Sequence, residues 1–129
     1  MDLMRDSATL TAFVATTDAQ RATAFYRDIL GLRLVSDEPV ALVFDANGTR
    51  IRVQKLERFA PQPFTVLGWW VSDLRGTIPK LVARGVAFER YAWAKQDSLG
   101  IWLAPSGAGV AWFKDPDGNV LSLTQDVQA

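Results

Sequence analysis

An approximate internal repeat constrains the fold of this chain more than any other feature of its sequence. Segments 18–31 and 73–85 each begin at an Asp and end at a Gly, and both carry apolar residues at helical spacing. Their starts are 55 residues apart and their ends 54. Such a repeat predicts two supersecondary units that each pack a helix on one face of a sheet. We therefore expect an α+β fold of two tandem βαβββ modules forming a curved mixed sheet with helices on the outer face.

Local signals define the elements of the first module. The apolar spacing over 22–30 predicts a helix that ends at Gly31. Thr17 and Gln20 have the spacing of a capping box, and Asp18 suits the positive end of a helix. Strands are expected at 8–16, 32–36, 40–44 and 50–54.

The second module repeats this plan after a linker. Residues 55–63 lose periodicity and contain two Pro, which predicts an extended connection. Ser72 and Asp73 indicate the start of a second helix, whose first turn Gly76 and Pro79 are expected to distort. Strands are expected at 64–71, 86–89, 101–104, 110–114 and 120–124. We take 1–129 as one domain, with module one at about 1–56, the linker at about 57–63 and module two at about 64–129.

The second module is longer than the first between its helix and its last hairpin. The glycine turns at 45–48 and 115–118 are 70 residues apart, whereas the helix starts are 55 apart. The additional residues coincide with segment 90–100, which carries Tyr91 and Trp93. Long loops in small domains are lids, binding loops or surface excursions without a function. We interpret this one as a loop that covers part of the sheet, and the functionless alternative stays open.

Turn chemistry predicts the strand registers of the second module. Residues 115–118, Asp-Pro-Asp-Gly, favour a type I turn followed by a one-residue bulge. This register places Trp112 opposite Ser122. The turn at 105–107 places Trp102 on the same sheet face as Trp112.

The same construction predicts the register of the first module. A turn over 45–49 places Leu42 opposite Arg52. Phe44 and Arg52 then lie on one face of the sheet, and Val43 lies on the face that covers the helix.

The sheet face turned away from the helices is expected to combine aromatic, cationic and hydroxyl side chains. Its members are Phe44, Arg50, Arg52, Gln54, Trp102, Trp112, Ser122 and Thr124. A guanidinium pairs with a carboxylate and an indole stacks on a ring, so this surface suits a flat or anionic organic ligand. Two alternatives stay open: the Trp residues can be core, and the alternation around Arg50 and Arg52 also occurs on a half-solvated strand.

Residues that the chain lacks exclude whole classes of chemistry. There is no His and no Cys among 129 residues, so Ser-His-Asp and Cys-His nucleophiles and Cys/His zinc sites are excluded. The 14 Lys and Arg balance the 14 Asp and Glu without forming a basic block, so we expect no nucleic acid partner. The Asp residues fall at helix starts and turns, and no inward-facing pair of carboxylates emerges for acid–base catalysis.

The sequence shows no sign of membrane insertion or secretion. No apolar run approaches the roughly 20 residues of a membrane-spanning helix, so we expect no membrane partner. The first residues alternate in charge and lack the apolar stretch of a signal peptide. We therefore expect a cytoplasmic protein.

Two sequence motifs and the repeat resemble a known superfamily. The motifs are FYRDILGL at 25–32 and AWFKDPDGNVLSL at 111–123. Together with the duplicated βαβββ plan, they resemble the vicinal oxygen chelate superfamily, which includes glyoxalase I, extradiol dioxygenases and bleomycin resistance proteins. The resemblance covers nearly the whole chain and implies this fold.

The resemblance also implies where a metal ion would bind. In metal-using members, His, Gln or acidic side chains on four strands bind the ion, and the matching positions here are Thr11, Arg52, Val66 and Ser122. None of these is a suitable ligand, and Arg52 would place a positive charge at the cation. We therefore expect no metal, no other cofactor and no catalytic residues.

By resemblance to the bleomycin resistance proteins, we expect a metal-free homodimer that binds a small aromatic or anionic molecule. Those proteins lack the metal and hold their drugs in an aromatic-lined crevice between two subunits. The ligand-binding residues expected here are Phe13, Phe44, Arg52, Trp70, Tyr91, Trp93, Trp102, Trp112 and Ser122.

Two other functions stay open at this point. The first is a glyoxalase-like lyase or isomerase, or a dioxygenase, with an atypical divalent metal site. Its proton transfer would need Glu89 or Tyr91. The second is a module whose apolar surface serves only to pair with another protein.

Overall fold

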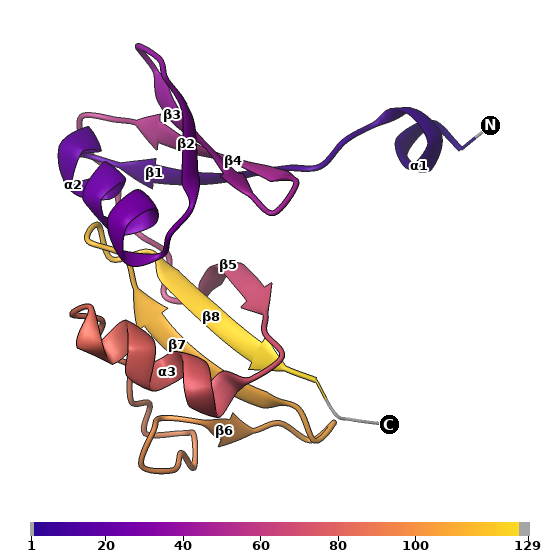
Figure 1. The fold of residues 1–129 in the computed structure, drawn as a ribbon, viewed down its shortest axis with the longest axis vertical. Coiled ribbons are helices and arrows are strands. Elements are labelled where there is room, and N and C mark those ends of the chain that lie inside the picture. The colour runs from indigo at the N-terminus through magenta and orange to yellow at the C-terminus, as the bar shows by residue number, and fades with distance from the viewer. Residues whose placement is uncertain (1, 127–129) are drawn as a thin grey trace. The chain divides into compact units, whose positions relative to one another are not determined.

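The computed structural model describes residues 2–126, which form two compact units divided between Phe59 and Ala60. The first unit contains α1 (Leu3–Ser7), β1 (Thr11–Thr16), α2 (Ala19–Thr23), η1 (Ala24–Ile29), β2 (Arg33–Asp37), β3 (Ala41–Ala46) and β4 (Thr49–Lys55). The second contains β5 (Thr65–Trp70), α3 (Leu74–Ala83), β6 (Trp102–Leu103), β7 (Gly109–Lys114) and β8 (Val120–Gln125). Figure 1 shows these elements along the chain.

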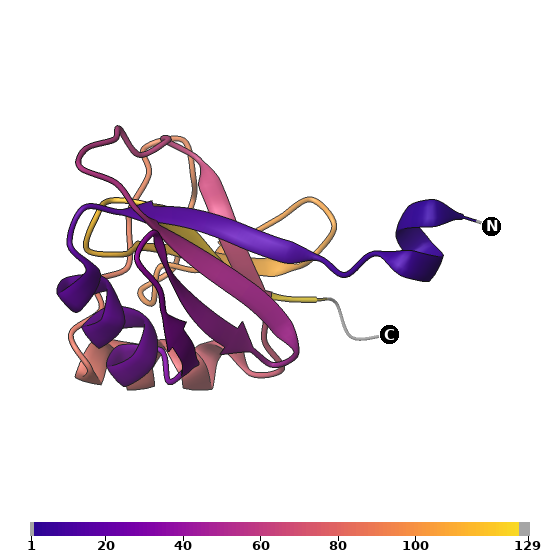
Figure 2. The ribbon, with the colours of Figure 1, turned by 90° about the horizontal axis from the view of Figure 1, so that it is seen from above.

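Each unit has its own four-stranded mixed sheet with the same topology. The strand orders are β1-β4-β3-β2 and β5-β8-β7-β6, and in each sheet the first two strands of that order are parallel. The α+β class and the two βαβββ modules are therefore confirmed. The sequence did not predict α1, which buries none of its residues and is joined to β1 by an extended stretch (Figure 2). No helix within residues 2–126 has the length and apolar character needed to cross a bilayer.

The helical segment of the first unit begins at Asp18. The Asp18 carboxylate accepts a hydrogen bond from the backbone N–H of Arg21 at 3.0 Å, so Asp18 is the N-cap. The prediction of a capping box at Thr17 and Gln20 is therefore wrong. A carboxylate at the cap position satisfies one of the free amides of the first helical turn.

The predicted helix over 18–30 changes type halfway. After α2 the chain continues as the π-helix η1, in which the N–H of Leu30 donates to the carbonyl oxygen of Phe25. Phe25 and Tyr26 are both buried and pack edge to face, with ring centroids 5.1 Å apart. Tyr26 also packs against Phe44 of β3, with ring centroids 5.6 Å apart, so these rings join the helical segment to its sheet.

The β3–β4 hairpin departs by one residue from its predicted register. Asn47 and Gly48 both have positive φ, 51° and 98°, and form a two-residue turn. Arg52 is therefore opposite Val43, and the predicted pairing with Leu42 is wrong. A shift of one residue moves every β3 side chain to the opposite face of the sheet relative to β4. Phe44 therefore lies in the core of the unit, and Val43 shares the face of Arg52.

The registers of the second unit agree with their predictions. Trp112 is opposite Ser122, and Trp102 is opposite Val110. Of the strand predicted over 86–89, only an isolated bridge from Phe88 to β7 forms. The β7–β8 hairpin pairs without a register shift over its whole length.

The helix of the second unit, α3, runs as one continuous element. Asp73 caps it by accepting from the backbone N–H of Gly76 at 3.0 Å. The helix contains Pro79 and still runs unbroken to Ala83, so the expected distortion is not found. Its buried side chains, with those of β7 and β8, form the core: Leu74, Ile78, Leu81, Ala111, Phe113, Leu121 and Leu123.

Candidate ligand-binding site

Four side chains of the second unit form one contiguous group, which we call the aromatic cluster: Tyr91, Trp93, Trp102 and Trp112. The ring centroids of Trp102 on β6 and Trp112 on β7 are 5.8 Å apart. Trp93 meets these two rings edge to face, at 5.3 and 5.6 Å. Tyr91 stacks on Trp93 at 5.9 Å. Stacked and edge-to-face pairs are the favoured aromatic arrangements, so the four rings support one another.

The aromatic cluster has an inner and an outer layer. Trp112 is only 9% exposed, whereas Trp93 is 65% exposed. Segment 90–100 therefore covers part of the sheet, as its length indicated, by returning onto the rings of β6 and β7. The outermost indole, that of Trp93, remains available to another molecule.

Gln96 holds this loop in place. Its Nε2 donates to the carbonyl oxygens of Glu89 and Gly100, at 3.0 and 2.8 Å, and its Oε1 accepts from the N–H of Tyr91 at 2.9 Å. Gln96 also forms a β-bridge with Trp102. Gln96 was not predicted from the sequence, because a lone Gln in a loop carries no pattern that indicates which backbone groups it will meet.

Asp97 is the second anchor of the loop. One carboxylate oxygen accepts from the N–H groups of Leu99 and Ile101, at 2.9 and 3.0 Å, and the other pairs with Arg75 of α3 at 2.6 Å. Burial raises the pKa of Asp97, but the hydrogen bonds from Ile101, Arg75 and Leu99 together outweigh it, and the pKa lies below its ordinary value. The ionised carboxylate is therefore the form that holds the loop.

Acid is expected to weaken the loop through Asp97. Because the pKa is lower in the folded protein, this contribution is complete above the ordinary Asp pKa of about 3.9 and is lost as the pH falls through the folded value. A titration of the Asp97 carboxyl carbon by NMR should give a pKa below the ordinary one. In Arg75→Gln the pKa should rise toward it. An Asp97 pKa that is ordinary in the wild type, or equal in the two proteins, would contradict the role of this ion pair.

Trp70 and Ser122 lie on the same sheet face as Trp112. Ser122 pairs with Trp112 on one side and with Gly68 on the other, and Trp70 is two residues further along β5. Ser122 is buried, and a Cβ at Gly68 would lie 2.6 Å from its Oγ. Gly68 therefore leaves room for the Ser122 hydroxyl. Trp70 is 72% exposed.

Two of the predicted site residues share a face in the first unit. Phe13 and Arg52 are neighbours across β1 and β4, whereas Phe44 lies on the opposite face, which corrects its predicted position. Arg52 pairs with Glu38 at 3.2 Å, and Ser36 also donates to Glu38, at 2.8 Å. These hydrogen bonds, that of Ser36 first, lower the pKa of Glu38, so an internal carboxylate already balances Arg52.

The two groups considered for proton transfer are not arranged as bases. Burial and, to a lesser degree, the Glu89 carboxylate raise the pKa of Tyr91, so its phenol stays protonated at neutral pH. Glu89 forms an ion pair with Lys114 at 3.5 Å. A general base has to be unprotonated and free to reach its substrate.

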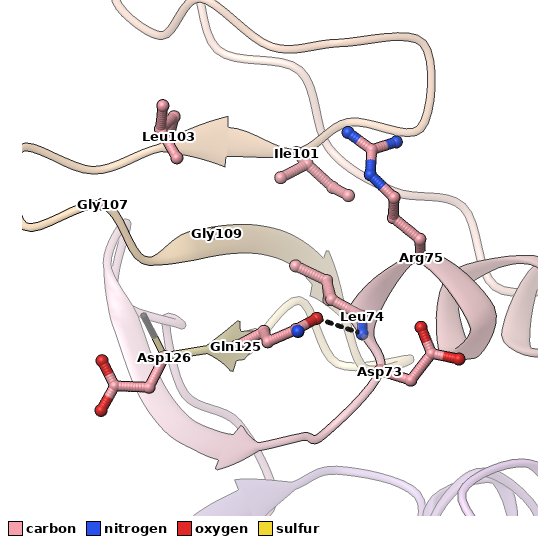
Figure 3. A pocket seen from close by; sticks show the side chains of 9 residues that line it. All are labelled: Asp73, Leu74, Arg75, Ile101, Leu103, Gly107, Gly109, Gln125 and Asp126. Carbon is pink, nitrogen blue, oxygen red and sulfur yellow. Dashed lines mark hydrogen bonds between the residues drawn. The ribbon is translucent and has the colours of Figure 1, made fainter. Parts of the chain in front are cut away.

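A pocket of about 410 Å³ lies on the other face of the second sheet, beside the start of α3 (Figure 3). Its polar groups are already engaged. Gln125 accepts from the N–H of Leu74 at 2.9 Å, Asp73 caps the helix, and Arg75 pairs with Asp97. These groups build the start of the helix, so we place the candidate site on the aromatic cluster instead.

The residues at the family's metal-binding positions do not fit a divalent ion. Thr11, Arg52, Val66 and Ser122 offer hydroxyl, alkyl and guanidinium groups, whereas such ions take carboxylate or imidazole ligands. Within residues 2–126, no three acidic side chains lie close enough together to hold a metal ion.

Comparison with known proteins identifies the family. Residues 8–123 match the family described as the Glyoxalase/Bleomycin resistance protein/Dioxygenase superfamily. The chain belongs to this family. The vicinal oxygen chelate superfamily is the same group, so the resemblance of the motifs at 25–32 and 111–123 is confirmed. No curated protein matches the chain.

Solved structures of the glyoxalase family share this fold. A bleomycin resistance determinant encoded on the transposon Tn5 has a TM-score of 0.73 at 19% identity, over 93% of this chain and 98% of that one. Lactoylglutathione lyase from Agrobacterium tumefaciens has a TM-score of 0.69 at 19% identity, over 92% and 93%. A superfamily member from Sphaerobacter thermophilus has 0.71 at 22% identity, over 92% and 96%. At such identities the likeness shows the fold alone, which hosts several activities.

Proposed function

We propose that this glyoxalase-family protein is a metal-free small-molecule binding protein. Its ligand is a flat aromatic or anionic organic molecule that stacks on the aromatic cluster of the second unit. The observation that carries the proposal is the exposed indole of Trp93, which rests on three other rings.

The rigidity of this surface supports a binding role. Gln96 and Asp97 fix the loop through five hydrogen bonds to backbone groups, so little conformational entropy remains to be lost when a ligand stacks on Trp93. Preorganised aromatic side chains give large contact areas at low entropic cost.

The chemistry of the donor groups supports the metal-free part of the proposal. The family's metal positions carry no suitable ligand, Tyr91 is protonated at neutral pH, and Glu89 is paired with Lys114. We therefore favour binding over the glyoxalase-like reaction.

We further propose that the protein acts as a homodimer, as its resemblance to bleomycin resistance proteins implies. Large exposed rings are typical of protein interfaces, and Trp70 is 72% exposed. A second copy of this chain is the proposed partner of this surface.

Replacing Trp93 by Ala tests the proposed function. With 2-naphthoate as the probe in isothermal titration calorimetry, Trp93→Ala is expected to weaken binding about tenfold, because one stacked ring and its contact area are lost. Trp69→Phe is the matched control, since Trp69 alternates with Trp70 and faces the opposite side of the sheet. It should bind as the wild type does.

Two outcomes would contradict the proposal. One is binding of 2-naphthoate that Trp93→Ala leaves unchanged, or no binding at all. The other is one tightly held divalent ion per subunit in native mass spectrometry of the same samples, which would favour the alternative of a glyoxalase-like enzyme. The expected mass in that measurement is the mass of a dimer without bound metal.

A further inference from the structure

Arg50 is an uncompensated cation in the first unit. Its Nη1 is buried without a hydrogen-bond partner, and within residues 2–126 the Arg50 guanidinium forms no ion pair. A buried donor without a partner lowers stability, and native proteins pair nearly all such groups with protein, water or a bound ion. A group of this kind therefore needs a partner from outside the chain.

No carboxylate within residues 2–126 forms an ion pair with Arg50. Asp45 is directly opposite Arg50 on β3 but has its ion pair with Arg33, at 4.0 Å. Glu38 pairs with Arg52. The Arg50 guanidinium therefore has no ion-pair partner within residues 2–126, whereas Arg52, two residues further along β4 on the same face, pairs with Glu38.

An apolar surface lies next to this charge. On β1, Thr11 pairs with Arg50 and Phe13 pairs with Arg52, so Phe13 is the diagonal neighbour of Arg50 on one face. The Phe13 ring is more than half exposed. A charge and an exposed ring at diagonal positions match the two ends of a small aromatic acid.

We propose that Arg50 and Phe13 form a binding site for an aromatic carboxylate in the first unit. The carboxylate pairs with the Arg50 guanidinium, whose fork of donors matches both oxygens, and the ring packs on Phe13. Binding turns the guanidinium so that Nη1 gains its partner. This inference goes beyond the proposed function, because it uses no residue of the aromatic cluster.

The probes are sodium benzoate and its neutral isostere benzamide. They are titrated into the full chain at low salt, with the side-chain Nε–Hε signal of Arg50 followed by NMR. Benzoate should shift this signal saturably and bind about tenfold more tightly than benzamide, as a charge-assisted pair requires. Equal affinities for the two probes, or no shift of Arg50 by benzoate, would overturn the proposal.

Variants assign the effect to Arg50. Arg50→Met keeps the length of the side chain and should weaken benzoate binding about tenfold. Arg27→Met, which removes an exposed charge from η1, should leave it unchanged. Benzoate should raise the melting temperature of the wild type but not that of Arg50→Met. The site would be refuted if Arg50→Met bound benzoate as tightly as the wild type, or if Arg50→Met and Arg27→Met lost affinity for benzoate equally.

Two further variants separate loss of the site from loss of the fold and from binding at the aromatic cluster. Arg50→Lys keeps the charge without the fork and should bind benzoate with intermediate affinity, so the test stands even if Arg50→Met does not fold. Trp93→Ala should leave the Arg50 response to benzoate intact. If it abolishes that response, the site is not in the first unit and this inference fails, whereas the proposed function survives.

Discussion

Phe44→Ala is expected to lower the free energy of unfolding by about 3–5 kcal/mol, the cost of truncating a fully buried Phe. Phe44 is 0% exposed, contacts Tyr26 of η1 and lies opposite Ile51. Its removal leaves a cavity between the helical segment and the sheet, which the surrounding rings cannot fill without strain.

Phe13→Ala is the matched control for this prediction. The Phe13 side chain is 53% exposed, so its loss should cost less than about 1 kcal/mol. Denaturant unfolding followed by circular dichroism measures both variants. Similar small effects would instead support the register in which Leu42 is opposite Arg52 and Phe44 faces a ligand.

Asp115→Ala is expected to cost about 2–4 kcal/mol, because it leaves several donors in the final hairpin without acceptors. The Asp115 carboxylate accepts from the N–H groups of Asp117 and Asn119, both at 3.0 Å, and from the Asn119 side-chain amide at 2.8 Å. Asp115 and Asn119 are both about 5% exposed, so water cannot replace these bonds.

The controls for Asp115 separate its hydrogen bonds from its charge. Asp28→Ala removes an equal charge from an exposed position beside Arg27 and should change stability by less than about 0.5 kcal/mol. Asp115→Asn keeps one acceptor oxygen and should fall between the two. The role of the carboxylate would be contradicted if Asp115→Ala and Asp28→Ala had equal unfolding free energies in urea.

The two glycine turns show how far turn chemistry predicts register. In the turn at 115–118, Pro116 has a φ near −65°, which suits a type I turn and excludes the mirror-image type I′. In the turn at 45–48, Asn47 and Gly48 both adopt positive φ, as a two-residue type I′ turn requires. Treating the turns as equivalent caused the error at Phe44, although the Asn-Gly pair was visible in the sequence.

The binding surface was predictable only in part. Alternation along the strands was enough to place Trp102 and Trp112 on one face, because side-chain direction in a strand has a period of two. That Tyr91 and Trp93 cover those rings depends on Gln96, which meets the carbonyl groups of Glu89 and Gly100. Loop paths of this kind are determined by contacts between residues that have no fixed spacing.

The charges of the first unit illustrate the same limit. Arg50 and Arg52 have the same spacing pattern in the sequence, which placed both on the sheet face suited to a ligand, and only Arg52 was counted among the expected ligand-binding residues. In the structure Glu38 pairs with Arg52, whereas Nη1 of Arg50 has no hydrogen-bond partner among residues 2–126. A long flexible side chain can reach several possible partners, so the sequence cannot show which guanidinium forms an ion pair and which does not.

The sequence by itself determined the fold class, the two modules, the start of each helix near an Asp and the absence of His or Cys chemistry, since these depend on composition or on residues a few positions apart. Only the tertiary structure decided that the helical segment over 24–29 is a π-helix, that Phe44 is core, that the loop over 90–100 closes on the sheet and that Nη1 of Arg50 meets no acceptor in the described part of the chain. Each of these outcomes depends on which distant side chains come within contact distance, and packing of the folded chain alone selects those pairs.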